Sequence, residues 1–205
     1  MSAISDIIGI GDKLGIIQAV KSRLLKQPDR AADKLITVLD EIYKIYGSLE
    51  AELPQFLALN FDPTDAEGLA RERAKLLALE GGEVTARMGQ ARGHCAKIGN
   101  IYTRYLNPWF QRVLGDSDVA KLGGLFHDPD EFDGRMVIAI DRTADWLTKE
   151  STEVLHLVDS QKYTEANERV RKARSYILPQ RLAATKVMRA LLDLQAEFIG
   201  LSGAV

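Results

Sequence analysis

The chain has 205 residues, of which 46% are hydrophobic and 27% are charged, so it can bury the core of one domain and is not composed like a disordered protein. Its net charge of -2 excludes a nucleic-acid binder held by bulk positive charge, and we expect no nucleic-acid partner. Its single cysteine, Cys95, excludes an intramolecular disulfide and a zinc site built from several thiolates.

The first 27 residues form an apolar segment that predicts an N-terminal helix over about 4–26, which could be separable from the rest of the chain. Ile7, Leu14 and Ile17 lie on one side of this helix, and other isoleucines lie on its remaining faces. A helix that is apolar on most faces is either central in a core or in contact with another surface. We therefore predict these three side chains as interaction residues.

The same segment resembles neither a signal peptide nor a transmembrane helix. No basic residue precedes its apolar run, and its longest uncharged stretch, at 14–20, is far shorter than the roughly 20 residues that span a membrane. No other segment comes closer to a span. We expect a soluble, cytoplasmic protein.

Apolar residues then recur in four long stripes with alternating steps of three and four residues, a spacing that keeps one face of a helix against a partner. The stripes are Leu35, Leu39, Ile42, Tyr46, Leu49, Leu53 and Phe56; Ala70, Ala74, Leu77, Gly81, Val84, Met88, Ala91, Cys95, Ile98, Tyr102, Tyr105 and Trp109; Val137, Ile140, Ala144, Leu147, Ser151, Val154 and Val158; and Tyr163, Ala166, Val170, Ala173, Ile177, Gln180, Ala184, Val187, Leu191, Leu194, Phe198 and Leu201. No segment sustains the period-two alternation of strands.

These patterns predict an all-α protein, an elongated antiparallel bundle of about five helices with heptad-spaced seams, in a single domain over residues 1–205. The expected helices span 4–26, 29–60, 64–107, 130–160 and 162–201, with a short helical piece near 116–125. Capping residues beside prolines at 62–65 and 128–131 support two of these boundaries. We expect kinks at Gly81–Gly82 and at Pro179.

The last predicted helix carries two features beyond its seam. Residues 161–205 contain 8 basic and 4 acidic residues, and Arg171, Arg174 and Arg181 represent the basic face that this excess creates. That face either packs against acidic helices of the bundle or meets an acidic partner or an anionic membrane. Leu178 and Leu182 lie well away from the seam and predict a second apolar face, inside a five-helix arrangement or between subunits.

Candidate chemical sites are weak. Glu153 and His156 have the Glu-x-x-His spacing of di-iron bundles, but the pair occurs only once and beside the seam, so a solvated helix face explains it better. Aromatic residues cluster at Tyr102–Phe110 and predict either a plug that closes one end of the bundle or a pocket for an apolar ligand. We predict no catalytic residue, no metal and no cofactor, and an enzyme is not expected.

The sequence therefore favours a non-catalytic scaffold or regulatory module that acts through protein–protein contacts, with a protein partner or with itself as an oligomer. The alternative is a membrane-active effector or regulator whose apolar N-terminal helix engages an anionic bilayer. The acidic residues Asp6 and Asp12 count against the alternative.

Overall fold

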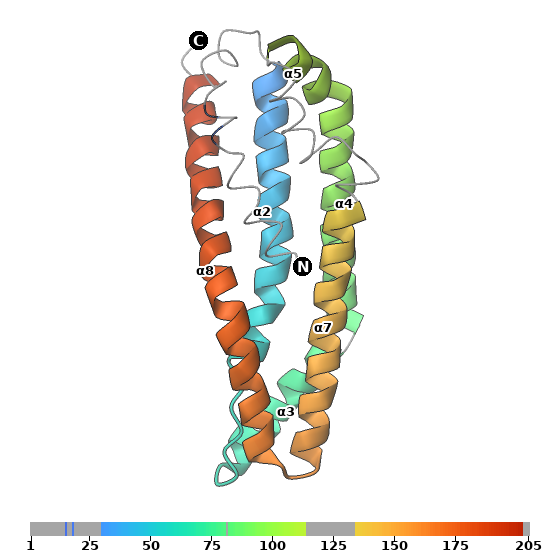
Figure 1. Cartoon of the computed structure of the whole chain (residues 1–205), viewed down its shortest axis with the longest axis vertical. Coiled ribbons are helices and arrows are strands. Elements are labelled where there is room, and N and C mark those ends of the chain that lie inside the picture. The colour runs from blue at the N-terminus through green and yellow to red at the C-terminus, as the bar shows by residue number, and fades with distance from the viewer. Residues whose placement is uncertain (1–14, 16–17, 19–29, 81, 114–133, 203–205) are drawn as a thin grey trace.

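The computed structural model describes residues 15, 18, 30–80, 82–113 and 134–202 (Figure 1). These residues are helical except at two turns, 58–65 and 160–162, and include no strand, so the predicted all-α class is confirmed. Of the expected helix at 4–26 only residues 15 and 18 are described, and both are helical; the short piece near 116–125 lies outside the described residues. The described elements, in chain order, are α2 (Arg30–Leu57), α3 (Ala66–Glu80), α4 (Gly82–Ile101), the π-helix η1 (Tyr102–Leu106), α5 (Asn107–Val113), α7 (Gly134–Asp159) and α8 (Tyr163–Ser202).

Four long helices, α2, α4, α7 and α8, run side by side with alternating chain direction (Figure 1). Helix α2 contacts α4 and α8, and helix α7 also contacts both, so the four form a closed ring of neighbours. Helix α3 continues the α4 arm toward the lower end of the molecule and packs mainly against α7. No helix within the described ranges is long and apolar enough to cross a membrane.

Helix α2 supplies the centre of the core. Six of the seven stripe residues predicted on it are buried, and Tyr46 is partly buried. Val38 and Ile45 are buried as well, which widens the apolar face beyond one seam. A face this wide explains how α2 contacts α4 on one side and α8 on the other.

The stripe predicted on α3 is wrong. Ala70, Ala74 and Leu77 are exposed, whereas Leu76 and Leu79 are buried. The phase of the α4 stripe therefore does not continue into α3. Helix α3 instead turns its leucines toward α7, because burying a leucine removes more apolar surface from water than burying an alanine.

The prediction also fails at Tyr105, which is half exposed although the stripe placed it inward. The amide of Asn107 donates to the carbonyl of Tyr102, five residues earlier, which makes 102–106 a turn of π-helix. The wider turn changes the phase of the buried face. Tyr102, Leu106 and Phe110 are consequently buried at steps of four, and Tyr105 faces outward beneath the Lys34 ammonium.

Side-chain hydrogen bonds shape the turn between α2 and α3. Asp65 caps α3, since its Oδ1 accepts the Gly68 amide at 2.9 Å. Asn167 of α8 holds the backbone of Phe61 with two bonds of 2.8 Å, one accepted from the amide and one donated to the carbonyl. The loop is thus attached to the first turns of α8.

Candidate functional site

One exposed face of α8 repeats the spacing of a buried seam. Seven residues follow one another in steps of four and three, and every one is exposed. We call this set the α8 stripe: Leu178, Leu182, Thr185, Arg189, Leu192, Ala196 and Ile199. The exposed fractions of its four large apolar residues are 41% for Leu178, 59% for Leu182, 42% for Leu192 and 53% for Ile199.

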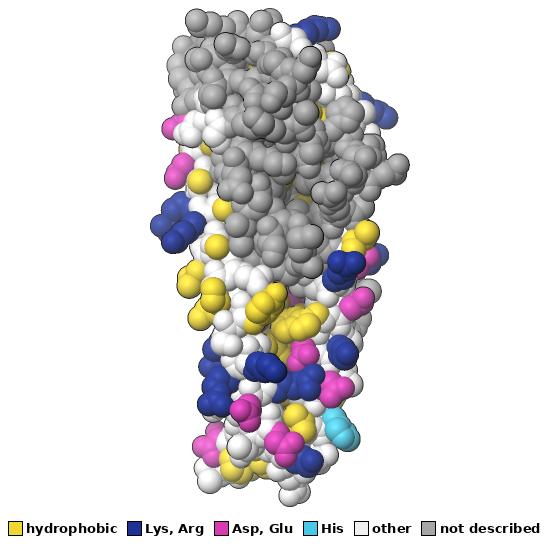
Figure 2. All heavy atoms as spheres, viewed as in Figure 1, with side chains coloured by type: hydrophobic (Ala, Val, Ile, Leu, Met, Phe, Trp, Pro, Cys, Tyr) yellow, Lys and Arg dark blue, Asp and Glu magenta, His cyan; other side chains and the backbone are white. Residues whose placement is uncertain are grey.

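These four residues share one side of the helix. At 100° per residue, Leu192 and Ile199 fall within about 60° of Leu178, and Leu182 falls about 40° to the other side. The Tyr46 hydroxyl lies 2.7 Å from the Thr185 hydroxyl, which itself donates to the Arg181 carbonyl. The stripe therefore runs beside α2, and hydrophobic side chains are exposed at mid-height on the face drawn in Figure 2. Of the predicted interaction residues, Leu178 and Leu182 belong to the stripe, whereas Ile7, Leu14 and Ile17 lie outside the described residues.

The predicted basic face divides into residues that are held by carboxylates and residues that are not. Arg181 binds Glu50 of α2 through two hydrogen bonds of 2.8 and 2.5 Å, and this pairing raises the pKa of Arg181. Arg169 likewise binds both oxygens of Glu150 on α7, at 2.7 and 3.0 Å. These two arginines join α8 to its neighbours.

Arg171 and Arg174 are not held in this way by a carboxylate of a neighbouring helix. Arg174 donates from Nε to the carbonyl of Leu57, at the C-terminal end of α2, over 2.8 Å. Arg171 is 76% exposed, and its one ion-pair partner among the described residues is Glu168, one turn earlier on α8, at 3.4 Å. The three residues that represented one basic face in the sequence thus have three separate environments.

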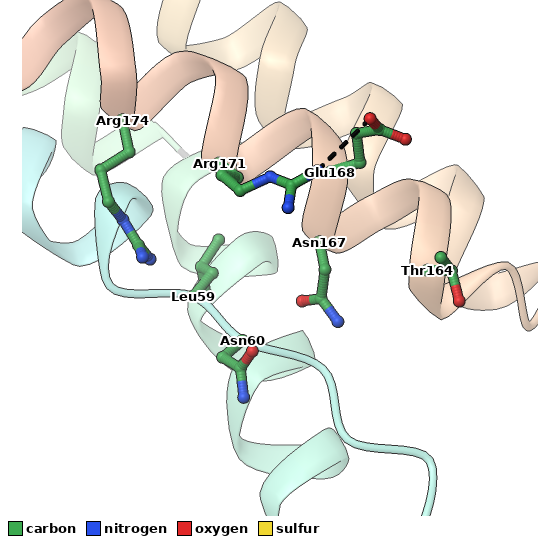
Figure 3. Close-up of a pocket in the computed structure, with 7 residues that line it drawn as sticks. All are labelled: Leu59, Asn60, Thr164, Asn167, Glu168, Arg171 and Arg174. Carbon is green, nitrogen blue, oxygen red and sulfur yellow. Dashed lines mark hydrogen bonds and ion pairs between the residues drawn. The ribbon is translucent and has the colours of Figure 1, made fainter.

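Arg171 and Arg174 line a pocket of about 330 Å³ between α8 and the α2–α3 loop (Figure 3). In this view Arg174 and Asn167 extend from α8 toward the loop that carries Leu59 and Asn60, and Arg171 lies between them along the helix. The remaining lining residues, Thr164 and Glu168, also come from α8. The walls of the pocket are therefore mostly polar, and Leu59 is their apolar residue.

Buried carboxylates join α2 to α4. Glu41 is 1% exposed, and its oxygens lie 2.6 Å from Lys97 Nζ and 2.6 Å from His94 Nδ1, both on α4. Further along α2, the buried Glu52 pairs with Arg87. Sequence reasoning missed these pairs because a lone glutamate on a helix resembles a solvated residue. The available signal was the apolar row Val38 and Ile45, which Glu52 continues seven residues later.

The two remaining candidate sites, the Glu153–His156 pair and the aromatic cluster, show no grouping of reactive or metal-ligating side chains among the described residues. Glu153 and His156 are both exposed, and Glu153 lies 3.7 Å from an Arg169 nitrogen. No group of three or more potential metal-ligating side chains occurs among the described residues. At the aromatic end, Tyr102 and Trp109 both pack against Phe110, with ring centroids 6.2 and 5.2 Å away, and burial raises the pKa of Tyr102 to about 12.

Comparison of this chain with protein-family models, with curated proteins and with solved structures finds no match.

Proposed function

We propose that the protein is an interaction module whose α8 stripe binds one amphipathic helix of a protein partner. The observation that supports this proposal is the spacing of the exposed residues. Single exposed leucines are ordinary on protein surfaces, but apolar residues repeated at heptad spacing are typical of helix–helix contacts. From Leu178 to Ile199 the stripe extends about 32 Å, enough for some six turns of a partner helix.

The polar members of the stripe define the chemistry of that partner. Arg189 lies near the middle of the stripe, is exposed, and Leu192 follows it three residues later. A partner helix with leucine-like residues at heptad positions would pack against Leu192, and an acidic residue opposite Arg189 would pair with its charge. Such charge complementarity sets register and selectivity more than affinity.

The competing proposal is membrane engagement by residues 1–27. It depends on a segment of which only residues 15 and 18 are described, and no feature of the described surface favours it. Of the three arginines that represented the basic face, Arg181 is already paired with a carboxylate, as is Arg169 on the same helix.

A photo-crosslinking experiment tests the protein-binding proposal. A photoreactive amino acid replaces Leu192 in the full-length chain, and illumination in the native host should yield one defined protein adduct. The double variant Leu182→Asp/Leu192→Asp should weaken the purified complex at least about 100-fold, since apolar contacts at the centre of an interface each contribute roughly 2 kcal/mol. Leu77→Ser, at an exposed leucine on α3, is the matched control and should bind as the wild type does.

The outcomes separate the possible occupants. An adduct with a second copy of the chain would make the partner the protein itself. The absence of any specific adduct, or equal binding by the double variant, would overturn the proposal. Circular dichroism of the double variant establishes that the bundle is still folded, since both positions are exposed.

A further inference from the structure

The pocket beneath α8 collects arginine hydrogen-bond donors that the fold leaves largely unused. Arg169 and Arg181 each donate two N–H groups to one carboxylate, whereas Arg174 directs only its Nε to a carbonyl oxygen. Arg171 is 3.4 Å from Glu168, well beyond the 2.7–2.9 Å of a strong charge-assisted bond. Of the four arginines between residues 169 and 181 of α8, the two without a tight carboxylate partner among the described residues are the two that line the pocket.

Neutral donors complete the lining. The Asn60 amide and the Thr164 hydroxyl are exposed at the pocket wall. Asn167 donates one side-chain N–H to the Phe61 carbonyl, and its amide nitrogen carries a second N–H that can donate to a ligand. Two guanidinium groups against one carboxylate, Glu168, leave the lining with an excess of one positive charge.

The pocket wall is held in place before any ligand arrives. The two hydrogen bonds between Asn167 and the backbone of Phe61 attach the loop to α8. Leu59 and Phe61, on either side of Asn60, are each only 1% exposed and anchor that loop in the core. A preformed wall avoids the entropic cost of ordering a loop upon binding.

We propose that this pocket binds the oxyanion group of a small molecule, a phosphate or a carboxylate, between Arg171 and Arg174. Arginine is suited to this role because its planar guanidinium matches the geometry of both anions. Glu168 competes with the ligand for Arg171 and lowers the affinity. This site is separate from the α8 stripe, which begins at Leu178, and does not depend on the function proposed for that stripe.

NMR titration of the ¹⁵N-labelled full-length chain tests the site, with inorganic phosphate in one series and acetate in another, each matched by sodium chloride at equal ionic strength. Saturable shifts should appear at the amides of Asn60, Thr164 and Asn167, with a Kd on the order of 1 mM for so small a probe. Shifts with phosphate alone assign a phosphate-bearing ligand, and shifts with acetate alone assign a carboxylate.

Three variants establish whether the named side chains cause the binding. Arg171→Gln should raise the Kd at least about fivefold, and Glu168→Gln should lower it several-fold by releasing Arg171. Lys172→Gln removes an exposed charge of α8 outside the pocket lining and should leave the Kd unchanged. The absence of saturable shifts up to about 20 mM of either anion, or equal weakening by Arg171→Gln and Lys172→Gln, would overturn the proposal, because bulk charge alone would then explain any effect.

Discussion

Glu41 is the residue whose charge the fold protects most clearly. Burial alone would raise the pKa of this carboxyl, but hydrogen bonds from Lys97, His94 and Lys44 outweigh it and lower the pKa from 4.5 to about 2. The charged form is therefore favoured in the folded chain. Stability from this group is fully present above the unfolded pKa of 4.5 and is lost as the pH falls from there through about 2.

Replacing Glu41 with Gln should accordingly flatten the acid limb of the stability profile. We expect the free energy of unfolding of the wild type to lose about 1–2 kcal/mol more than that of the variant between pH 5 and pH 2, after allowance for solvent screening of the lysines. Urea denaturation at several pH values measures the difference. Asp145→Asn, at an exposed position on α7, is the control and should retain the wild-type slope. Parallel profiles for wild type and Glu41→Gln would contradict this account.

Residue-level prediction from sequence succeeded for the leucines of the α2 stripe and failed for the buried polar side chains. The leucines of the α2 stripe are buried because their spacing alone matches the helix period. Glu41 and Glu52 could not be found in this way, since their burial depends on cations that lie 35 to 56 residues later on α4. Arg174 and Arg181 likewise bind partners on α2, 117 and 131 residues earlier in the chain.

At the scale of helices, α4 is weakened by its own glycines. An added Cβ at Gly89 or at Gly93 would meet no atom within 4 Å. Alanine at either position should raise the free energy of unfolding by about 0.5–1 kcal/mol, because glycine loses more backbone entropy in a helix. Urea denaturation with unchanged m-values checks the gain.

Gly68 in α3 is the contrasting case. A Cβ there would collide with the Asp65 carboxylate that caps the helix, so Gly68→Ala should lower stability, by about 1 kcal/mol if the cap is lost. A gain at all three glycines would show that the cap contributes nothing.

Element boundaries were more predictable than element phases. Where the flanking residues are described, at the ends of α2 and α7 and at the start of α8, the helix bounds lie within three residues of the expected ones. The expected helix 64–107 is instead divided into α3, α4 and η1. The local spacing of apolar residues does not reveal this division, because the face that α3 buries is determined by its contact with α7, some 70 residues later in the chain.

At the scale of the molecule, the two proposals for function differ in their response to loss of residues 1–27. If the α8 stripe is the surface that binds the partner, neither the full chain nor a chain without residues 1–27 should release dye from anionic vesicles. The comparison is made at concentrations at which a pore-forming peptide does release the dye. Leakage by the full chain alone would favour the membrane alternative and would demote the protein-binding proposal. The sequence predicted Leu178 and Leu182 as part of a second face, but it could not show that Leu192 and Ile199 extend that face.

The buried pairs of α2 and α4 also limit how the chain length can vary. Glu41 and Glu52 are 11 residues apart, about 17 Å along the helix, and each meets its cation at a fixed height on α4. One residue inserted between them would turn Glu41 by 100° relative to Glu52 and leave one carboxylate facing apolar neighbours, at a cost of several kcal/mol. Related chains are therefore expected to tolerate insertions in the loops far more readily than between residues 41 and 52, where a compensating insertion in α4 would be needed.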